Sequence, residues 1–289
     1  MDIEFENGVF VAKRDGVVVA QSKNRDYLKR KIQALIDTLP AEKKAVDEFA
    51  INDRFTFTEQ LVDMVATGQT ASCVITGEGG LGKSYSVMKA LRASGLKDVS
   101  ELPIGTTLAG ERKYFRVIKG FSTAKGLYKI LFENQTGIVV FDDCDSILKD
   151  PDATNLLKGA LDSYDKRYIT WNTSINDDGL PSSFEFKGGV VFISNMDKDR
   201  ISQAIRSRAM NVDLSMTTDQ KIERMATIME SDEFLPNISI EMKRDALDVI
   251  QEYKDKANEI SLRTLINVTK IRASGNDNWE QLAKYMLVN

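Results

Sequence analysis

The sequence predicts an α/β protein with a central parallel sheet, a C-terminal lid of four helices, and a small N-terminal cap made of a β-hairpin and a helix. Three short apolar runs, at residues 73–76, 138–141 and 190–193, each lead into glycine or polar residues, as buried parallel strands do. Beyond residue 216, apolar residues recur at helical spacing instead. We therefore expect three parts, at residues 1–40, 41–215 and 216–289.

A glycine-rich loop follows the first apolar run and fits the pattern G-x-x-x-x-G-K-[S/T]. A helical pattern comes directly after it, so the motif stands in the strand–loop–helix context that it needs, and a chance glycine-rich turn is the weaker interpretation. Glycines in such a loop turn backbone N–H groups toward a phosphate, and the helix N-terminus adds positive charge. Lys83 would neutralise the β- and γ-phosphates, while the Ser84 hydroxyl suits Mg²⁺. The expected nucleotide-binding residues are Gly77, Glu78, Gly79, Gly80, Leu81, Gly82, Lys83, Ser84 and Tyr85.

The second apolar run ends in a pair of carboxylates, Asp142 and Asp143. Asp142 would hold Mg²⁺ through its water shell, and Asp143 stands where a base could polarise an attacking water. A strand-capping turn would also explain two aspartates at this position. Because the pair follows a phosphate loop, with a helical segment at residues 125–133 just before it, we favour the functional interpretation.

The third run ends in Asn195, and ligands of open parallel sheets collect at the carboxyl ends of the strands. Asn195 is therefore a candidate to reach the γ-phosphate or the attacking water. Arg206 and Arg208 follow, just before another short apolar stretch around Val212 and Leu214. On sequence alone the two arginines are most simply a solvated helix end.

The order of these features resembles the AAA+ ATPases, a branch of the P-loop NTPases, over residues 58–285. The resemblance implies that ATP and Mg²⁺ bind between the core and the helical lid, in a homo-oligomer such as a hexameric ring. It makes Asn195 the residue called sensor 1, and it implies that Arg208, or else Arg206, reaches the nucleotide of a neighbouring subunit. It also implies that Arg263 acts from the first turn of a lid helix. The implied catalytic residues are Lys83, Asp143, Asn195, Arg208 and Arg263.

Three further features bear on the kind of AAA+ protein. Residues 168–173 and 184–186 resemble the hairpin that some AAA+ clades insert before sensor 1, with residues 174–183 as a substrate-contacting tip or a plain surface turn. Phe121 is a candidate for an aromatic pore loop, although helix packing is the simpler role. Most relatives carry Glu where this chain has Asp143, so hydrolysis could be reduced or differently arranged. As a whole, the chain resembles small phage-type AAA+ ATPases.

Composition excludes several other classes of protein. The 289 residues include no histidine, which rules out histidine-based general-base catalysis and histidine-ligated metal sites. No apolar run approaches the ~18 residues of a membrane span, and the acidic N-terminus lacks a signal-peptide profile. Cys73 and Cys144 fall in or next to predicted strands, which fits a reducing cytoplasm. The net charge of −4 argues against a surface that binds nucleic acid throughout.

These features predict a cytoplasmic ATPase that hydrolyses ATP in an oligomeric ring to remodel a macromolecular client. The acidic balance favours a protein client slightly over DNA, and no membrane partner is expected. The main alternative is a DNA-directed machine, such as a clamp loader, a helicase loader or a branch-migration motor. A third hypothesis is an ATP-dependent scaffold that hydrolyses slowly.

Overall fold

The computed structural model describes residues 2–6, 8–14, 17–29, 48–103, 113–120, 122–171 and 179–289 of the chain. The chain divides into two compact units, Met1–Glu48 and Phe49–Asn289. In the part of the chain described, no helix is long and apolar enough to cross a membrane.

The first unit is a three-stranded antiparallel sheet followed by helical residues 25–29. The predicted hairpin is present, since β2 (Val9–Arg14) pairs with β3 (Val17–Ser22). The prediction omitted β1 (Asp2–Glu6), whose apolar and acidic residues alternate and whose Phe5 lies opposite Phe10, with the ring centroids 4.8 Å apart. A third strand gives the ribbon support that two strands alone lack. The rest of the predicted helix and the predicted boundary at residue 40 lie outside the described residues.

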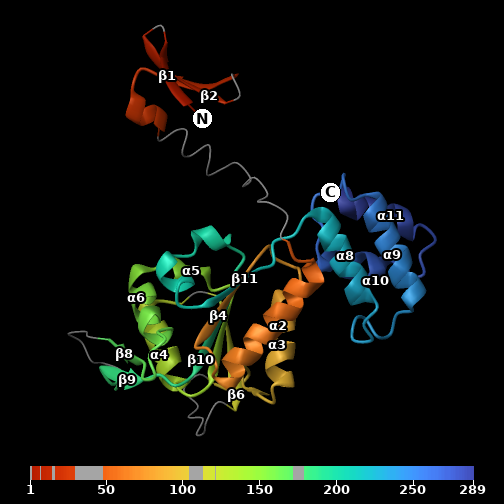
Figure 1. The fold of residues 1–289 in the computed structure, drawn as a ribbon. Coiled ribbons are helices and arrows are strands. Elements are labelled where there is room, and N and C mark those ends of the chain that lie inside the picture. Colours follow the sequence, from red (N-terminus) through yellow and green to blue (C-terminus); the bar gives the residue numbers. More distant parts are fainter. Residues whose placement is uncertain are drawn as a thin grey trace. The chain divides into compact units, whose positions relative to one another are not determined.

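The second unit is built on a six-stranded sheet in which all neighbouring strands are parallel, in the order β11-β4-β10-β7-β6-β5 (Figure 1). The predicted α/β fold with a parallel sheet is confirmed. Because β10 lies between β4 and β7, the three predicted apolar runs are adjacent strands whose carboxyl ends meet at one sheet edge. The strands are β4 (Ser72–Thr76), β5 (Lys97–Asp98), β6 (Tyr114–Lys119), β7 (Ile138–Asp142), β10 (Gly189–Ile193) and β11 (Met210–Asp213).

Helices cover both faces of this sheet (Figure 1). In β7, Ile138 and Val140 pack with the helices of one face, whereas Val139 and Phe141 pack with those of the other. A strand buried on both faces must be apolar throughout, which is why these strands read as continuous apolar runs rather than alternating ones. One face carries α2 (Ile51–Thr67) and α3 (Lys83–Ala93), and the other carries α4 (Ala124–Glu133), α5 (Asp145–Lys149) and α6 (Pro151–Ala160).

A two-stranded hairpin stands before β10, as the sequence predicts. Its strands, β8 (Tyr168–Thr170) and β9 (Ser183–Glu185), pair antiparallel. Phe184 anchors the hairpin to α4, because its ring packs edge-on against Tyr128 with the centroids 5.2 Å apart. Residues 174–178 of the predicted tip and the pore-loop candidate Phe121 lie outside the described residues.

The C-terminal lid contains four helices, as predicted: α8 (Thr218–Met229), α9 (Ile240–Glu252), α10 (Leu262–Ala273) and α11 (Trp279–Val288). They share an apolar core of their own. Thr217 and Ser261 start α8 and α10 as capping boxes, in which side chain and backbone satisfy each other's hydrogen bonds. The lid also contacts α2, since the Arg224 guanidinium lies 3.8 Å from the Phe55 ring centroid and Asn52 bonds to Thr227.

Both cysteines are buried and unpaired, as the sequence predicts. Burial raises the pKa of Cys73 to about 12 and that of Cys144 to about 11, the latter with help from neighbouring carboxylates. Thiols with such pKa values stay protonated at neutral pH, so both side chains serve as small apolar groups.

Candidate nucleotide-binding site

The glycine-rich loop joins the end of β4 to the start of α3, and its glycines are required by close backbone approaches. Gly77 has φ +138°, and a Cβ on it would stand 2.9 Å from the backbone carbon of Leu214. Gly80 has φ +74°, and a Cβ there would stand 3.1 Å from Ser261 in the lid. Only glycine fits both the left-handed backbone and the small space. The loop is therefore fixed between the sheet and the lid.

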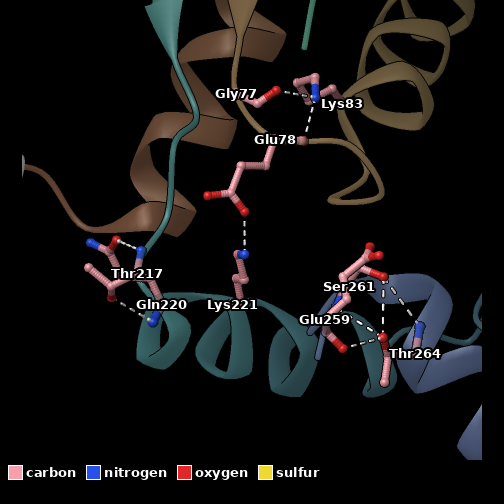
Figure 2. Close-up of polar contacts among 9 residues, drawn as sticks. All are labelled: Gly77, Glu78, Lys83, Thr217, Gln220, Lys221, Glu259, Ser261 and Thr264. Carbon is pink, nitrogen blue, oxygen red and sulfur yellow. Dashed lines mark hydrogen bonds and ion pairs between the residues drawn. The ribbon is translucent and has the colours of Figure 1, made fainter. Parts of the chain in front are cut away.

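Lys83, the first residue of α3, folds back over this loop. Its ammonium donates to the carbonyls of Gly77 at 2.8 Å and Glu78 at 2.6 Å, as Figure 2 shows, and to Asn195 Oδ1 at 2.9 Å. The side chain is buried, and burial lowers the pKa of Lys83, while Asp143 and other nearby carboxylates oppose that shift. Carbonyl oxygens do not neutralise the charge of a buried ammonium, so Lys83 would bind an anion such as a phosphate in the loop favourably.

Asp142 ends β7 beside the start of α3, and its carboxylate is nearly inaccessible to solvent. Its Oδ1 accepts a hydrogen bond from Ser84 Oγ at 2.8 Å, and its Oδ2 pairs with Lys119 Nζ at 3.1 Å. A hydroxyl oxygen and a carboxylate oxygen in contact are the hard ligands that Mg²⁺ prefers. Ser84 and Asp142 therefore have the ligand chemistry that would hold a magnesium ion.

Asn195 links Lys83 to the second carboxylate. Its Nδ2 donates to Asp143 Oδ1 at 2.6 Å, while its Oδ1 accepts from Lys83. The orientation of the amide follows from these partners, because an ammonium only donates and a carboxylate only accepts. Asp143 is exposed and has φ 58°, so its side chain leaves the end of the strand toward solvent. The structure thus brings the predicted Lys83, Asn195 and Asp143 together at one sheet edge.

The lid meets the loop at the N-terminus of α10. The Leu262 N–H donates to the Gly80 carbonyl at 2.8 Å. Arg263 follows as an exposed residue, and its Cγ would lie 3.9 Å from a Cβ on Gly80. The predicted Arg263 therefore starts next to the phosphate loop, with its guanidinium free of the lid core.

Two further contacts join the loop region to the lid, and only one residue of each belongs to the phosphate-loop motif or the residue after it. Glu78 forms an ion pair with Lys221 of α8 (Figure 2). The Tyr85 hydroxyl bonds to Glu233, which also pairs with Lys89 at 3.6 Å. No motif marks Lys221 or Glu233, because their roles come from the packing of a separate helical layer against the loop.

Arg206 and Arg208 lie away from the phosphate loop of their own chain. The Arg208 carbonyl accepts a hydrogen bond from the Oγ of Ser72, the first residue of β4. The phosphate loop follows the other end of that strand. The Arg208 side chain is exposed, and its guanidinium donates to the Ala204 carbonyl at 3.0 Å. Arg206 is partly buried and pairs with Asp199 at 3.3 Å. Neither arginine serves the nucleotide site of its own chain in this arrangement.

Comparison with known proteins finds a relative encoded by a phage. No family model matches the chain. An uncharacterized 36.7 kDa protein from the nrdC–mobD intergenic region of Enterobacteria phage T4 is 28% identical over 304 residues, which cover 98% of this chain and 87% of that protein. The similarity therefore extends over almost the whole chain.

Solved structures similar to this one include NtrX from Brucella abortus, in complex with ATP in one crystal and with ADP in another. The ATP complex has 15% sequence identity and a TM-score of 0.46, over 87% of this chain and 57% of the NtrX chain. The ADP complex has 12% identity and a TM-score of 0.40, over 91% and 53% of the two chains. This chain thus spans little more than half the length of NtrX.

Proposed function

We propose that this protein is an ATPase of the AAA+ type that binds ATP with Mg²⁺ and hydrolyses it in an oligomeric ring to remodel a macromolecular client. The observation that carries the proposal is the chain of contacts from Lys83 through Asn195 to Asp143, beside the Ser84–Asp142 pair. The lysine proposed to bind phosphate, the proposed metal ligands and the proposed base thus lie next to one another at the carboxyl edge of a parallel sheet.

Each residue of this network has a separate task. The loop N–H groups and Lys83 hold the phosphates, and Ser84 with Asp142 would hold Mg²⁺, which neutralises phosphate charge when bound. Asp143 takes the proton of the attacking water, and Asn195 fixes the direction of that carboxylate. Arg263 lies on α10 of the lid, next to Gly80, and adds a positive charge at the terminal phosphate.

The placement of Arg208 supports the assembly of subunits. It is exposed, and it lies at the end of β4 opposite the phosphate loop. An arginine that reaches a phosphate from there must reach the phosphate of another subunit. A closed ring gives every subunit such a neighbour, so hydrolysis would depend on assembly. Arg206 is the second choice, because it is already engaged by Asp199.

The nature of the client is the less direct part of the proposal. A net charge of −4 favours a protein client over nucleic acid. The similarity to an uncharacterized phage T4 protein supports the phage-type part of the proposal. A cytoplasmic location agrees with two buried, unpaired cysteines.

ATP binding by Lys83→Ala tests the proposal. We expect the variant to lose binding of a fluorescent ATP analogue, since the loop would keep its backbone donors but lose the charge that meets the β- and γ-phosphates. Lys129→Ala is the matched control, because Lys129 is an exposed lysine on α4 that pairs with Glu133.

Wild-type affinity in Lys83→Ala would contradict the assignment of the loop. In the same preparation, stimulation of ATP turnover by an unfolded protein supports the protein client. Stimulation by single-stranded or duplex DNA alone identifies a DNA-directed machine instead. ATP binding with turnover near background identifies the slow scaffold.

A further inference from the structure

Lys119 lies outside the sequence motifs that predict nucleotide binding. It is the last residue of β6, and its register partner in the neighbouring parallel strand is Asp142, the last residue of β7. Paired residues of adjacent strands project to the same face of a sheet. The Lys119 ammonium therefore lies beside the Asp142 carboxylate, with Nζ 3.1 Å from Oδ2.

The two members of this ion pair differ sharply in exposure. The Lys119 side chain is 66% exposed and the Asp142 side chain only 4%. A buried carboxylate is costly unless it is paired, while an exposed ammonium keeps most of its hydration. Lys119 thus neutralises Asp142 without being built into the core, and it can move when the charge around Asp142 changes.

The other groups that face Asp142 leave this counter-ion role to Lys119. Ser84 is neutral and donates to Oδ1. Lys83 interacts electrostatically with Asp142, but its ammonium is hydrogen-bonded to two loop carbonyls and to Asn195. Asp143, Asp145 and Glu78 add negative charge to the same region. Among the described residues, Lys119 is therefore the cation paired with the carboxylate of the candidate magnesium site.

We propose that Lys119 is a positioning residue of the metal site, which keeps free divalent cations off Asp142 and favours a cation that arrives with a nucleotide. A Mg²⁺ ion that approaches Asp142 without a nucleotide is repelled by the Lys119 ammonium, which has the same sign of charge and already contacts that carboxylate. Mg²⁺ carried by a triphosphate brings net negative charge, which the same ammonium attracts. The inference rests on the proposed function, because it takes Asp142 as the metal ligand.

The test uses Mn²⁺ alone as a spectroscopic substitute for Mg²⁺, with bound and free ion separated by electron paramagnetic resonance. We expect Lys119→Met to bind Mn²⁺ about tenfold more tightly than the wild-type protein in the absence of nucleotide. Lys119→Arg restores the charge and should return the affinity to the wild-type value. Lys129→Met, on α4, removes a lysine away from the site and should change nothing.

A second variant shows that the gained affinity belongs to this site. Asp142→Asn combined with Lys119→Met should lose it, because a neutral amide holds a hard cation poorly. Unchanged Mn²⁺ affinity in Lys119→Met, or gained affinity that survives Asp142→Asn, would overturn the inference.

Binding of a fluorescent ATP analogue separates the two proposals. If the wild-type protein binds ATP while Lys119→Met leaves Mn²⁺ affinity unchanged, only the role of Lys119 is wrong. If the wild-type protein binds no ATP, the proposed function fails.

Discussion

Asp143 holds a backbone conformation that most residues avoid. Its φ of 58° lies in the left-handed region, where non-glycine residues are strained by about 1 kcal/mol or more and aspartate is among the best tolerated. The N–H of Asp143 donates to the Ile193 carbonyl at 3.1 Å, and Asn195 holds its carboxylate. The turn therefore fixes where a short side chain points, at a position where the resemblance leads one to expect glutamate.

Replacing Asp143 by asparagine should separate binding from hydrolysis. Asn tolerates the left-handed backbone as well as Asp does, so the fold should persist. We expect binding of an ATP analogue to stay near the wild-type value while phosphate release falls at least about 100-fold, because the amide cannot accept the proton of water.

Asp150→Asn is the matched control for this change. Asp150 caps α6 by accepting from two backbone N–H groups, a task that asparagine performs equally well. If Asp143→Asn hydrolyses ATP as fast as Asp150→Asn, the base lies elsewhere.

At the scale of single residues, the sequence is informative where chemistry is local. Lys83 and Ser84 follow from one contiguous motif, and Asp142 and Asp143 follow from an apolar run that ends in acid. Lys119 could not be predicted in the same way. Its role depends on β6 lying next to β7, a neighbour relation set by the order of strands and not by any short pattern.

The phosphate loop and the start of α3 contact the lid through both main-chain and side-chain bonds. Leu262 N–H binds the Gly80 carbonyl, Lys221 pairs with Glu78, and Glu233 bonds to Tyr85. The Lys221 side chain is only 14% exposed, so its ion pair is shielded more than an ordinary surface pair. We infer that this pair slows the separation of the lid from the phosphate loop.

Glu78→Gln, Lys221→Met and the double variant test the loop–lid pair. Each single variant should release a fluorescent ADP analogue about fivefold faster, and the double variant should be no faster than either one, since all three lose the same contact. Stopped-flow release measures the rates, and Lys270→Met, an exposed lysine of the same lid, is the control. Rates that multiply in the double variant would show that the two residues act independently.

Helices and strands are predicted best where the local sequence carries a strong signal, such as a capping residue or an apolar stripe. Three of the four lid helices follow a capping residue that the sequence displays next to an apolar stripe, namely Thr217, Ser239 and Ser261. The strand Asp2–Glu6 was missed because its charged residues suggest an exposed end, and only its pairing with β2 makes it a strand. Pairing is a non-local property, so short strands are the elements that sequence patterns identify least well.

For the whole molecule, the central claim is that one chain supplies only part of the catalytic site. The residues proposed to bind phosphate and metal all come from a single chain and contact one another there. Arg208 lies at the opposite end of β4 and is exposed. Assembly is a property of surfaces from two chains, so the sequence of one chain indicates it only through resemblance.

Arg208→Ala should therefore bind ATP nearly as well as the wild-type protein but hydrolyse it poorly. Its own phosphate loop is intact. The variant loses the positive charge that stabilises the transition state in the neighbouring subunit, which can raise the rate of hydrolysis by about 10³-fold or more. Arg244→Ala is the control, because Arg244 is an exposed lid arginine that pairs with Glu230.

The most direct measurement is the ATP turnover of a mixture of Arg208→Ala and Lys83→Ala. Some interfaces of a mixed ring join an intact loop to an intact arginine, so turnover should exceed the sum of the two variants measured alone. It should also rise with protein concentration, as ring closure is a mass-action event. If light scattering shows that the two variants co-assemble while turnover stays at that sum, Arg208 does not act between subunits, and the account of a shared catalytic site is contradicted.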